Sequence, residues 1–119
     1  MIPDEKLRKR EHLLKAADFA RAYKKGRSAR DGFLVLYSVE NDLPYNRIGF
    51  SIGSRKVPRA TMRNSLRRLL REAFRRTKGA VRPGHDLIVV VVRGPATHPA
   101  YAAIERSYLS LASKNGLRC

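Results

Sequence analysis

Arginine recurs at every fourth position in one part of the chain, at Arg63, Arg67, Arg71 and Arg75. The surrounding segment, residues 60–78, has the apolar spacing of one long helix. On a wheel of about 100° per residue its leucines lie opposite the arginines. Like charges four residues apart weaken an isolated helix by about 0.2–0.5 kcal/mol per pair, so stability alone does not explain the series. Arginine makes planar, bidentate contacts with phosphate and stacks on bases, so the spacing predicts a surface that binds nucleic acid.

We call the polar arc of this helix the arginine ridge. It consists of Arg63, Asn64, Arg67, Arg68, Arg71 and Arg75. Two other interpretations stay open. One is a solvated helix face, although such faces usually mix charge signs and only Glu72 offers compensation here. The other is a basic amphipathic helix that lies on a membrane or binds calmodulin, which the neighbouring strands disfavour.

The whole chain shares the positive charge of the ridge. Its 119 residues include 26 Lys and Arg against 10 Asp and Glu, which gives a formal charge of +16. Such self-repulsion favours a polyanionic partner, and nucleic acid is the first candidate. The longest aliphatic run, residues 87–92, is too short to span a membrane, so we expect no membrane partner. The N-terminus lacks the apolar core of a secretory signal and Cys119 is the only cysteine, which predicts a cytoplasmic protein without disulfides.

The sequence offers no group of residues typical of catalysis. A self-sufficient metal nuclease needs clustered carboxylates to hold divalent ions, whereas the 10 acidic residues are scattered. His12, His85 and His98 have no adjacent serine, cysteine or paired acid. We therefore predict no catalytic residue in the protein and leave protein-bound metal sites unassigned.

The elements that must position the ridge are predicted in the order αββαβα. A first helix spans residues 13–25. Strands follow at residues 33–39 and 47–53, and the turn-forming loop between them predicts a hairpin. After the long helix, the uniformly apolar residues 86–93 predict a central strand that is buried on both faces. A last helix begins near residues 97–99.

We expect a single domain, residues 1–119, because no repeat, low-complexity tract or linker interrupts the chain. Residues 1–12 are rich in basic side chains and predict an arm that is extended or partly disordered until it is bound. Residues 13–115 form the globular core, an α+β arrangement of one sheet covered by helices. Phe33, Phe50 and Phe74 are expected inside that core.

The segment ATMRNSLRRLLRE at residues 60–72 closely resembles the signature of the protein subunit of bacterial ribonuclease P. The other matching segments are Arg10, Leu13, Asp18-Phe19, residues 35–37, residues 47–51 and residues 86–92. Together the resemblance covers residues 8–112. Two positions depart from the family pattern. Ser65 stands in place of a basic residue, and His12 stands where another arginine is often found.

The resemblance implies both a fold and a function. The implied fold is a two-layer α/β sandwich, with a mixed sheet packed by helices and the long helix in a left-handed βαβ crossover. The implied function is assistance to a catalytic RNA subunit, which removes the 5′ leader of precursor tRNA with Mg²⁺ held mainly by RNA and substrate. The protein is then inert alone, binds the catalytic RNA subunit and precursor tRNA, and needs no obligate protein partner.

The resemblance also assigns two groups of RNA contacts. The ridge, together with Arg55, Lys56 and Arg59 in the link before it, would contact the RNA subunit. A cleft between the first helix and the sheet would hold the single-stranded leader, whose bases stack on aromatic rings. The implied leader contacts are Arg10, Phe19, Tyr23, Val35, Tyr37 and Ser51. From pattern alone, Phe19 is more typical of a core residue, whereas the tyrosine hydroxyls disfavour burial.

Two alternative functions are considered beside the ribonuclease P subunit, and the second of them is the weakest. A general RNA-binding or ribosomal module would share the charge and the basic helix but would need no leader cleft. A self-sufficient nuclease would need the acidic cluster that the sequence does not offer.

Overall fold

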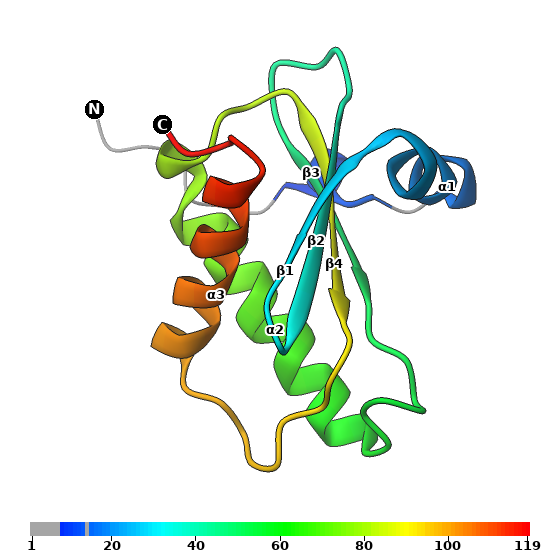
Figure 1. The fold of residues 1–119 in the computed structure, drawn as a ribbon, viewed down its shortest axis with the longest axis vertical. Coiled ribbons are helices and arrows are strands. Elements are labelled where there is room, and N and C mark those ends of the chain that lie inside the picture. Colours follow the sequence, from blue (N-terminus) through cyan, green and yellow to red (C-terminus); the bar gives the residue numbers. More distant parts are fainter. Residues whose placement is uncertain (1–7, 14) are drawn as a thin grey trace.

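The computed structural model describes residues 8–13 and 15–119. The α-helices in this part of the chain are α1 (Ala16–Lys25), α2 (Ala60–Arg76) and α3 (Tyr101–Lys114), and the 3₁₀ turns are η1 (Lys9–Glu11) and η2 (Lys78–Ala80). The strands are β1 (Arg27–Arg30), β2 (Leu34–Glu40), β3 (Arg47–Ser51) and β4 (His85–Val91). Figure 1 shows α2 and α3 on one side of the sheet and α1 on the other.

The four strands form one mixed sheet in the order β1-β2-β4-β3. β4 pairs antiparallel with β2 and parallel with β3, so Val89 lies between Leu36 and Phe50. Nearly every residue of β4 is buried. A strand without a polar face needs strands on both edges and helices on both faces, which places it at the centre. The predicted central strand is confirmed.

The predicted hairpin between residues 33–39 and 47–53 is wrong, because β4 lies between β2 and β3. The hairpin is instead formed by β1 and β2, which pair antiparallel from Arg27 opposite Ser38 to Arg30 opposite Val35. The αββαβα prediction lacks β1. This strand reads Arg-Ser-Ala-Arg and is mostly exposed, so it has no apolar alternation to reveal it.

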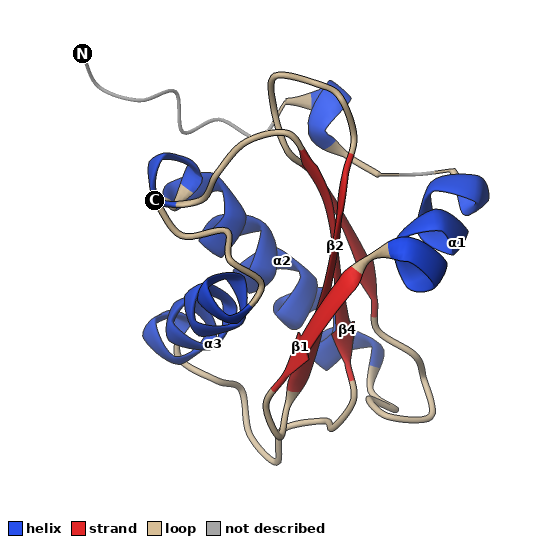
Figure 2. Cartoon of the chain, turned by 45° about the horizontal axis from the view of Figure 1, so that its top comes forward, coloured by secondary structure: helices blue, strands red, loops and turns tan. Residues whose placement is uncertain are grey.

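The two faces of the sheet carry separate clusters of buried side chains. Leu34 and Leu36 of β2 belong to the larger cluster, which α2 and α3 cover. Tyr37 and Val39 pack against a smaller cluster with Ala22 of α1. α1 therefore adds a partial third layer to the predicted two-layer sandwich (Figure 2). α2 joins the parallel neighbours β3 and β4, and the left hand of this crossover stays a prediction from the resemblance.

The predicted arm at residues 1–12 is wrong for its described part, residues 8–12, and residues 1–7 lie outside the described residues. His12 forms a parallel bridge with Ile48 of β3, and the Leu13 amide donates a hydrogen bond of 2.8 Å to the Ile48 carbonyl. Glu11 is 4% exposed, and its Oε1 lies 2.8 Å from Nζ of Lys78. This contact neutralises the buried carboxylate and fixes η1 against the end of α2.

The end of the chain is also packed. Leu117 is buried, and the amide of Cys119 donates to the carbonyl of Ala80 at 3.1 Å. The core therefore extends beyond the predicted limit at residue 115. α3 begins at Tyr101, after the predicted start at residues 97–99. In the described part of the chain, no helix has both the length and the apolarity that a membrane crossing requires.

Asp86, a fully buried acid in β4, ties several elements together. Its two carboxylate oxygens each accept a hydrogen bond of 2.7 Å from Arg47 of β3. Asn41, after β2, donates at 3.0 Å and Arg21 of α1 donates at 3.1 Å. Burial raises the pKa of Asp86, but the hydrogen bonds from these residues and the charge of Arg47 outweigh it and hold the pKa below its ordinary value.

Replacing Asp86 with Asn should lower the free energy of unfolding by about 3–5 kcal/mol, because it removes one partner of a buried ion pair. Urea denaturation at pH 7 measures this change. Because the pKa of Asp86 is depressed in the folded state, the wild-type protein should lose this stabilisation as the pH falls below the ordinary carboxyl range, and the Asp86→Asn variant should lack that part of the acid sensitivity.

Asp42→Asn is the matched control, since Asp42 is exposed and its φ of 58° also suits asparagine. This variant should stay within about 0.5 kcal/mol of the wild type. Identical urea curves for the two variants would show that the Asp86 network does not stabilise the fold.

Candidate nucleic-acid interface

A row of aromatic rings lies between α1 and the open face of the sheet. The ring centroids of Phe19 and Tyr23 are 6.4 Å apart, and Tyr23 meets Tyr37 edge to face at 4.9 Å and 86°. Tyr23 is 42% exposed, and Ser51 lies close enough to its hydroxyl to influence the pKa. We call Phe19, Tyr23, Tyr37 and Ser51 the aromatic cleft. Four of the six predicted leader contacts are thus brought together.

The surroundings of the Tyr23 hydroxyl raise its pKa. Burial raises the pKa of Tyr23 above its ordinary value, the hydrogen bond with Ser51 lowers it, and the neighbouring Tyr37 raises it further. The net direction is upward. Tyr23 therefore stays neutral at and above physiological pH and presents an exposed ring that can stack on a base.

The other two predicted leader contacts lie elsewhere. Val35 is on the same face of β2 as Tyr37, but it is only 8% exposed and offers little surface to a ligand. Arg10 is in η1, where its guanidinium carbon lies 4.6 Å from the ring centroid of Tyr45. Arg10 therefore belongs to a different surface from the aromatic cleft.

Phe19 also lines a groove along the outer edge of β3. Its lining residues are His12, Leu13, Phe19, Ile48, Gly49, Phe50, Arg67 and Arg71. We call this cavity of about 280 Å³ the edge groove. The ridge residues Arg67 and Arg71 form one wall of the groove, and Leu13 and Phe19 form the other. The aromatic cleft and the arginine ridge therefore meet at a single phenylalanine ring.

Sequence reasoning missed part of this groove. His12 and Gly49 were not predicted contacts, and Phe50, expected in the core, is only partly buried and lines the groove. Gly49 carried a usable signal, because a glycine inside a strand often marks the close approach of another group. A Cβ atom at Gly49 would lie 2.6 Å from Cζ of Phe19.

The arginines of the ridge are engaged to different extents. Arg63 donates to the backbone carbonyls of Val57 and Pro58, both at 2.9 Å, and so holds the end of the preceding link. Arg67 donates to Oδ1 of Asn64 at 3.2 Å. Arg68 and Arg71 are exposed, and neither forms a hydrogen bond or ion pair with the residues that the structure describes.

Glu72 neutralises the far end of the ridge. Its carboxylate pairs with Arg75 at 2.7 Å and with Arg76 at 3.1 Å. The hydrogen bond from Arg75 is the largest influence on the pKa of Glu72 and lowers it, with further lowering by the charges of both arginines against a slight raising by burial. The predicted pairing role of Glu72 is confirmed. The uncompensated charge of α2 is therefore concentrated around Arg67, Arg68 and Arg71.

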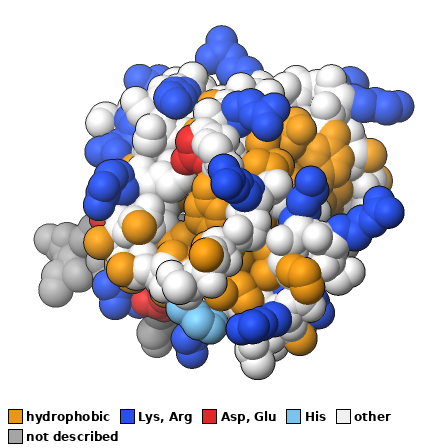
Figure 3. Space-filling model, turned by 60° about the horizontal axis from the view of Figure 1, so that its bottom comes forward, with side chains coloured by type: hydrophobic (Ala, Val, Ile, Leu, Met, Phe, Trp, Pro, Cys, Tyr) orange, Lys and Arg blue, Asp and Glu red, His pale blue; other side chains and the backbone are white. Residues whose placement is uncertain are grey.

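The link before α2 carries the remaining predicted RNA-subunit contacts. Arg55, Lys56 and Arg59 are all exposed. Gly94 allows this link to pack closely, because a side chain at Gly94 would collide with the carbonyl of Lys56. Figure 3 shows the lower end of the molecule, where Lys and Arg side chains surround a hydrophobic area and acidic side chains are few.

Acidic and histidine side chains do not form a cluster in the part of the chain that the structure describes. Among residues 8–13 and 15–119, no three His, Cys, Asp or Glu side chains come together in a way that could hold one. Asp86, the most buried acid, is fully engaged with arginine and asparagine. The two surfaces present cationic and aromatic groups, which define a small nucleic-acid-binding domain.

Comparisons with known proteins identify the family of this domain. A family model described as Ribonuclease P matches residues 7–115. The ribonuclease P protein component of Alkaliphilus metalliredigens is 39% identical over 102 residues, which cover 86% of this chain and 90% of that protein. The RNase P protein of Staphylococcus aureus superposes with a TM-score of 0.78 at 30% identity, covering 90% of this chain and 96% of that one. For the RNase P protein of Thermotoga maritima the TM-score is 0.75 at 29% identity, with coverage of 87% and 96%.

The chain belongs to the ribonuclease P protein family. It is therefore a subunit of the ribonucleoprotein endoribonuclease that processes tRNA, and its partner is the RNA subunit of that enzyme. The resemblance noted in the sequence is confirmed, as is the α+β class of the fold.

Replacing Gly49 with Ala should displace the Phe19 ring and lower the free energy of unfolding by about 1–3 kcal/mol, the typical effect of overpacking. Urea denaturation measures the loss, and the tyrosine signals of the near-ultraviolet circular dichroism spectrum report the disturbed ring row. Gly53→Ala is the control, because a Cβ atom there has no neighbour within 4 Å. Equal stability of the two variants would contradict the close packing of Phe19 on β3.

Proposed function

We propose that the protein uses two adjoining surfaces to hold two RNAs. The arginine ridge and its preceding link bind the catalytic RNA subunit, and the aromatic cleft holds the 5′ leader of precursor tRNA. The observation that carries this proposal is the position of Phe19, which belongs to the aromatic cleft and also faces Arg67 and Arg71 across the edge groove. One ring therefore lies at the junction of the two surfaces.

The aromatic cleft suits a single strand of variable sequence. Every base has a π face, so stacking contributes roughly 1–3 kcal/mol per base without demanding a sequence. Tyr23 supplies the most exposed ring, and Tyr37 supports it edge to face. A leader-binding surface needs this tolerance, because the leaders of different precursors differ in sequence.

The ridge suits a folded RNA that is read through its backbone. Arg68 and Arg71 are exposed and uncommitted within the described chain, so their guanidinium groups can contact phosphate without breaking a contact of the fold. Arg55, Lys56 and Arg59 extend the same charge into the link. Ser65, half-buried in α2, has no charge to add at the position where the family pattern has a basic residue.

The proposal assigns the chemistry to the RNA subunit. Mg²⁺ would be held by that RNA and the substrate, and the protein would raise the affinity for precursor tRNA without a catalytic residue of its own. The complex would act in the cytoplasm, without an obligate second protein.

Changing Arg68 to Ala should weaken binding to the RNA subunit and reduce the slope of log K against log salt by about one unit, because one phosphate contact releases about one counterion. Titration of the RNA subunit at several salt concentrations measures the slope. Arg106→Ala, which removes the same charge from an exposed position on α3, should leave the slope unchanged. A wild-type slope for the Arg68 variant would exclude this part of the ridge from the interface.

Changing Tyr23 to Ala should lower the affinity of the reconstituted holoenzyme for precursor tRNA by about 1–3 kcal/mol, the value of one stacked base. Affinity for mature tRNA, which has no leader, should stay at the wild-type value. The same preparations test the assignment of the chemistry, since the protein alone should leave the precursor uncut in Mg²⁺. Equal losses of affinity for both RNAs would show that Tyr23 supports the fold and does not contact the leader. If the protein bound RNA without any preference for a leader, a general RNA-binding module would be favoured.

A further inference from the structure

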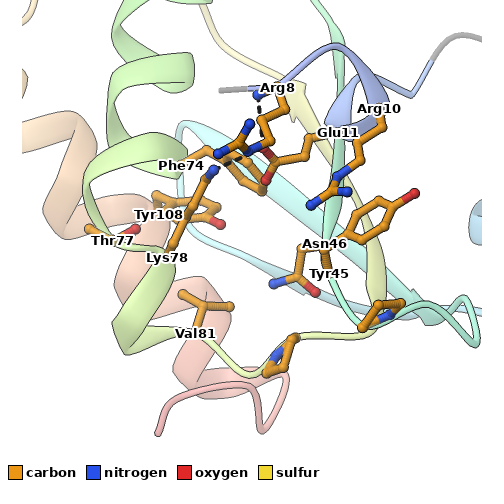
Figure 4. Close-up of a pocket in the computed structure, with 12 residues that line it drawn as sticks. Arg8, Arg10, Glu11, Tyr45, Asn46, Phe74, Thr77, Lys78, Val81 and Tyr108 are labelled. Carbon is orange, nitrogen blue, oxygen red and sulfur yellow. Dashed lines mark hydrogen bonds and ion pairs between the residues drawn. The ribbon is translucent and has the colours of Figure 1, made fainter. Parts of the chain in front are cut away.

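A second cavity, of about 240 Å³, lies where η1, the loop between β2 and β3 and the end of α2 meet (Figure 4). It shares no lining residue with the edge groove and contains no member of the aromatic cleft. Pro44 and Tyr45 of the loop form one wall, and Phe74 and Val81 form the other. Neither the ridge nor the leader cleft uses this space.

Tyr108 of α3 contributes a hydroxyl group to this cavity. Its side chain is 2% exposed and lines the cavity, and Figure 4 shows its oxygen directed to the space between α2 and Asn46. No hydrogen bond joins the hydroxyl to a residue in the described part of the chain. Because no buried side-chain polar atom there lacks a partner, the hydroxyl is open to the cavity. Burial raises the pKa of Tyr108 well above its ordinary value, so the group is a neutral donor and acceptor.

The neighbouring polar groups do not serve Tyr108. Asn46 donates to the carbonyl of Arg82 at 2.9 Å and accepts from the amide of His85 at 2.8 Å. The hydroxyl of Thr77 donates to the carbonyl of Ala73. The Tyr108 hydroxyl is therefore available to a polar atom of a ligand that enters the cavity.

The rest of the lining favours a ligand that combines a flat ring with a negatively charged group. Arg8, Arg10 and Lys78 place three positive charges around the cavity against the single carboxylate of Glu11. Arg10 lies over the ring of Tyr45, and such a pair presents a planar surface on which a base can stack. Phe74 and Tyr108, both buried, close the opposite side of the cavity.

The volume limits the size of the ligand. Pockets for drug-sized molecules measure roughly 300–1,000 Å³, so a cavity of about 240 Å³ accepts one ring system and no more. We propose that this cavity binds a single nucleotide unit, with its base against the Arg10–Tyr45 pair, a polar edge of the base at the Tyr108 hydroxyl, and its phosphate among the basic side chains at the rim. This site is independent of the proposed leader cleft.

Isothermal titration of the full chain with 5′-AMP tests the site. Tyr108→Phe should weaken binding roughly 2- to 10-fold, the value of one neutral hydrogen bond. The same change should leave the Tm of the free protein unchanged, because it keeps the ring and removes no hydrogen bond of the fold. Tyr101→Phe is the matched control, since Tyr101 lies on the same helix and its hydroxyl donates to Glu105 outside the cavity.

Three further probes identify what binds. Ribose 5-phosphate, which has charge but no base, should bind more weakly than 5′-AMP at equal ionic strength. Tyr23→Ala should leave the binding that depends on Tyr108 unchanged, which separates this cavity from the aromatic cleft. An adenosine trinucleotide distinguishes an RNA strand from free nucleotides. If it binds more tightly than 5′-AMP and its binding is weakened by Tyr108→Phe, the site belongs to an RNA strand. If it does not compete with 5′-AMP, the site belongs to free nucleotides.

The proposal is overturned if Tyr108→Phe titrates like the wild type, or if 5′-AMP binds no better than ribose 5-phosphate. Either result would reduce the binding to the general attraction of a chain with a formal charge of +16 for anions.

Discussion

The structure depends on one buried carboxylate. Asp86 receives hydrogen bonds from Arg21 of α1, Asn41 after β2 and Arg47 of β3, so a single residue fixes the positions of three segments around β4. In a chain with so few acids, a buried negative charge is a point where several cations can converge without repelling one another. The contact with Arg21 holds α1 over the sheet, and the aromatic cleft exists only because α1 lies there.

The sheet order then determines which surfaces can adjoin. Because β4 takes the central place, β3 is left at the edge, where its outer side is accessible to the segment before α1 and to α2. Gly49 lets the Phe19 ring approach this edge closely. A hairpin of β2 and β3 would have placed β3 inside the sheet and closed the groove between Phe19 and the arginines.

Sequence periodicity predicted the long helix, its basic arc and the central strand, because each depends on the spacing of apolar and charged residues within one segment. The resemblance supplied Phe19, Tyr23, Tyr37 and Ser51, which the structure brings together. Pairing between strands could not be predicted in the same way. β1 has no apolar alternation, and the place of β4 between β2 and β3 depends on contacts between residues more than 30 positions apart. The burial of Glu11 beside Lys78 and the position of Arg10 over Tyr45 are likewise properties of the folded chain.

Phe19 belongs to the aromatic cleft and also lines the edge groove beside the arginine ridge, and this has a thermodynamic consequence for the proposed complex. In the proposed complex, the Phe19 ring contacts a leader base on one side and borders the edge groove on the other. It cannot shift for one RNA without altering the site that binds the second RNA. Linkage then requires reciprocity: if binding of the RNA subunit increases the affinity for the leader by some factor, binding of the leader increases the affinity for the RNA subunit by the same factor. With a factor above one, a small protein with two touching surfaces favours the complete ternary assembly over either pair.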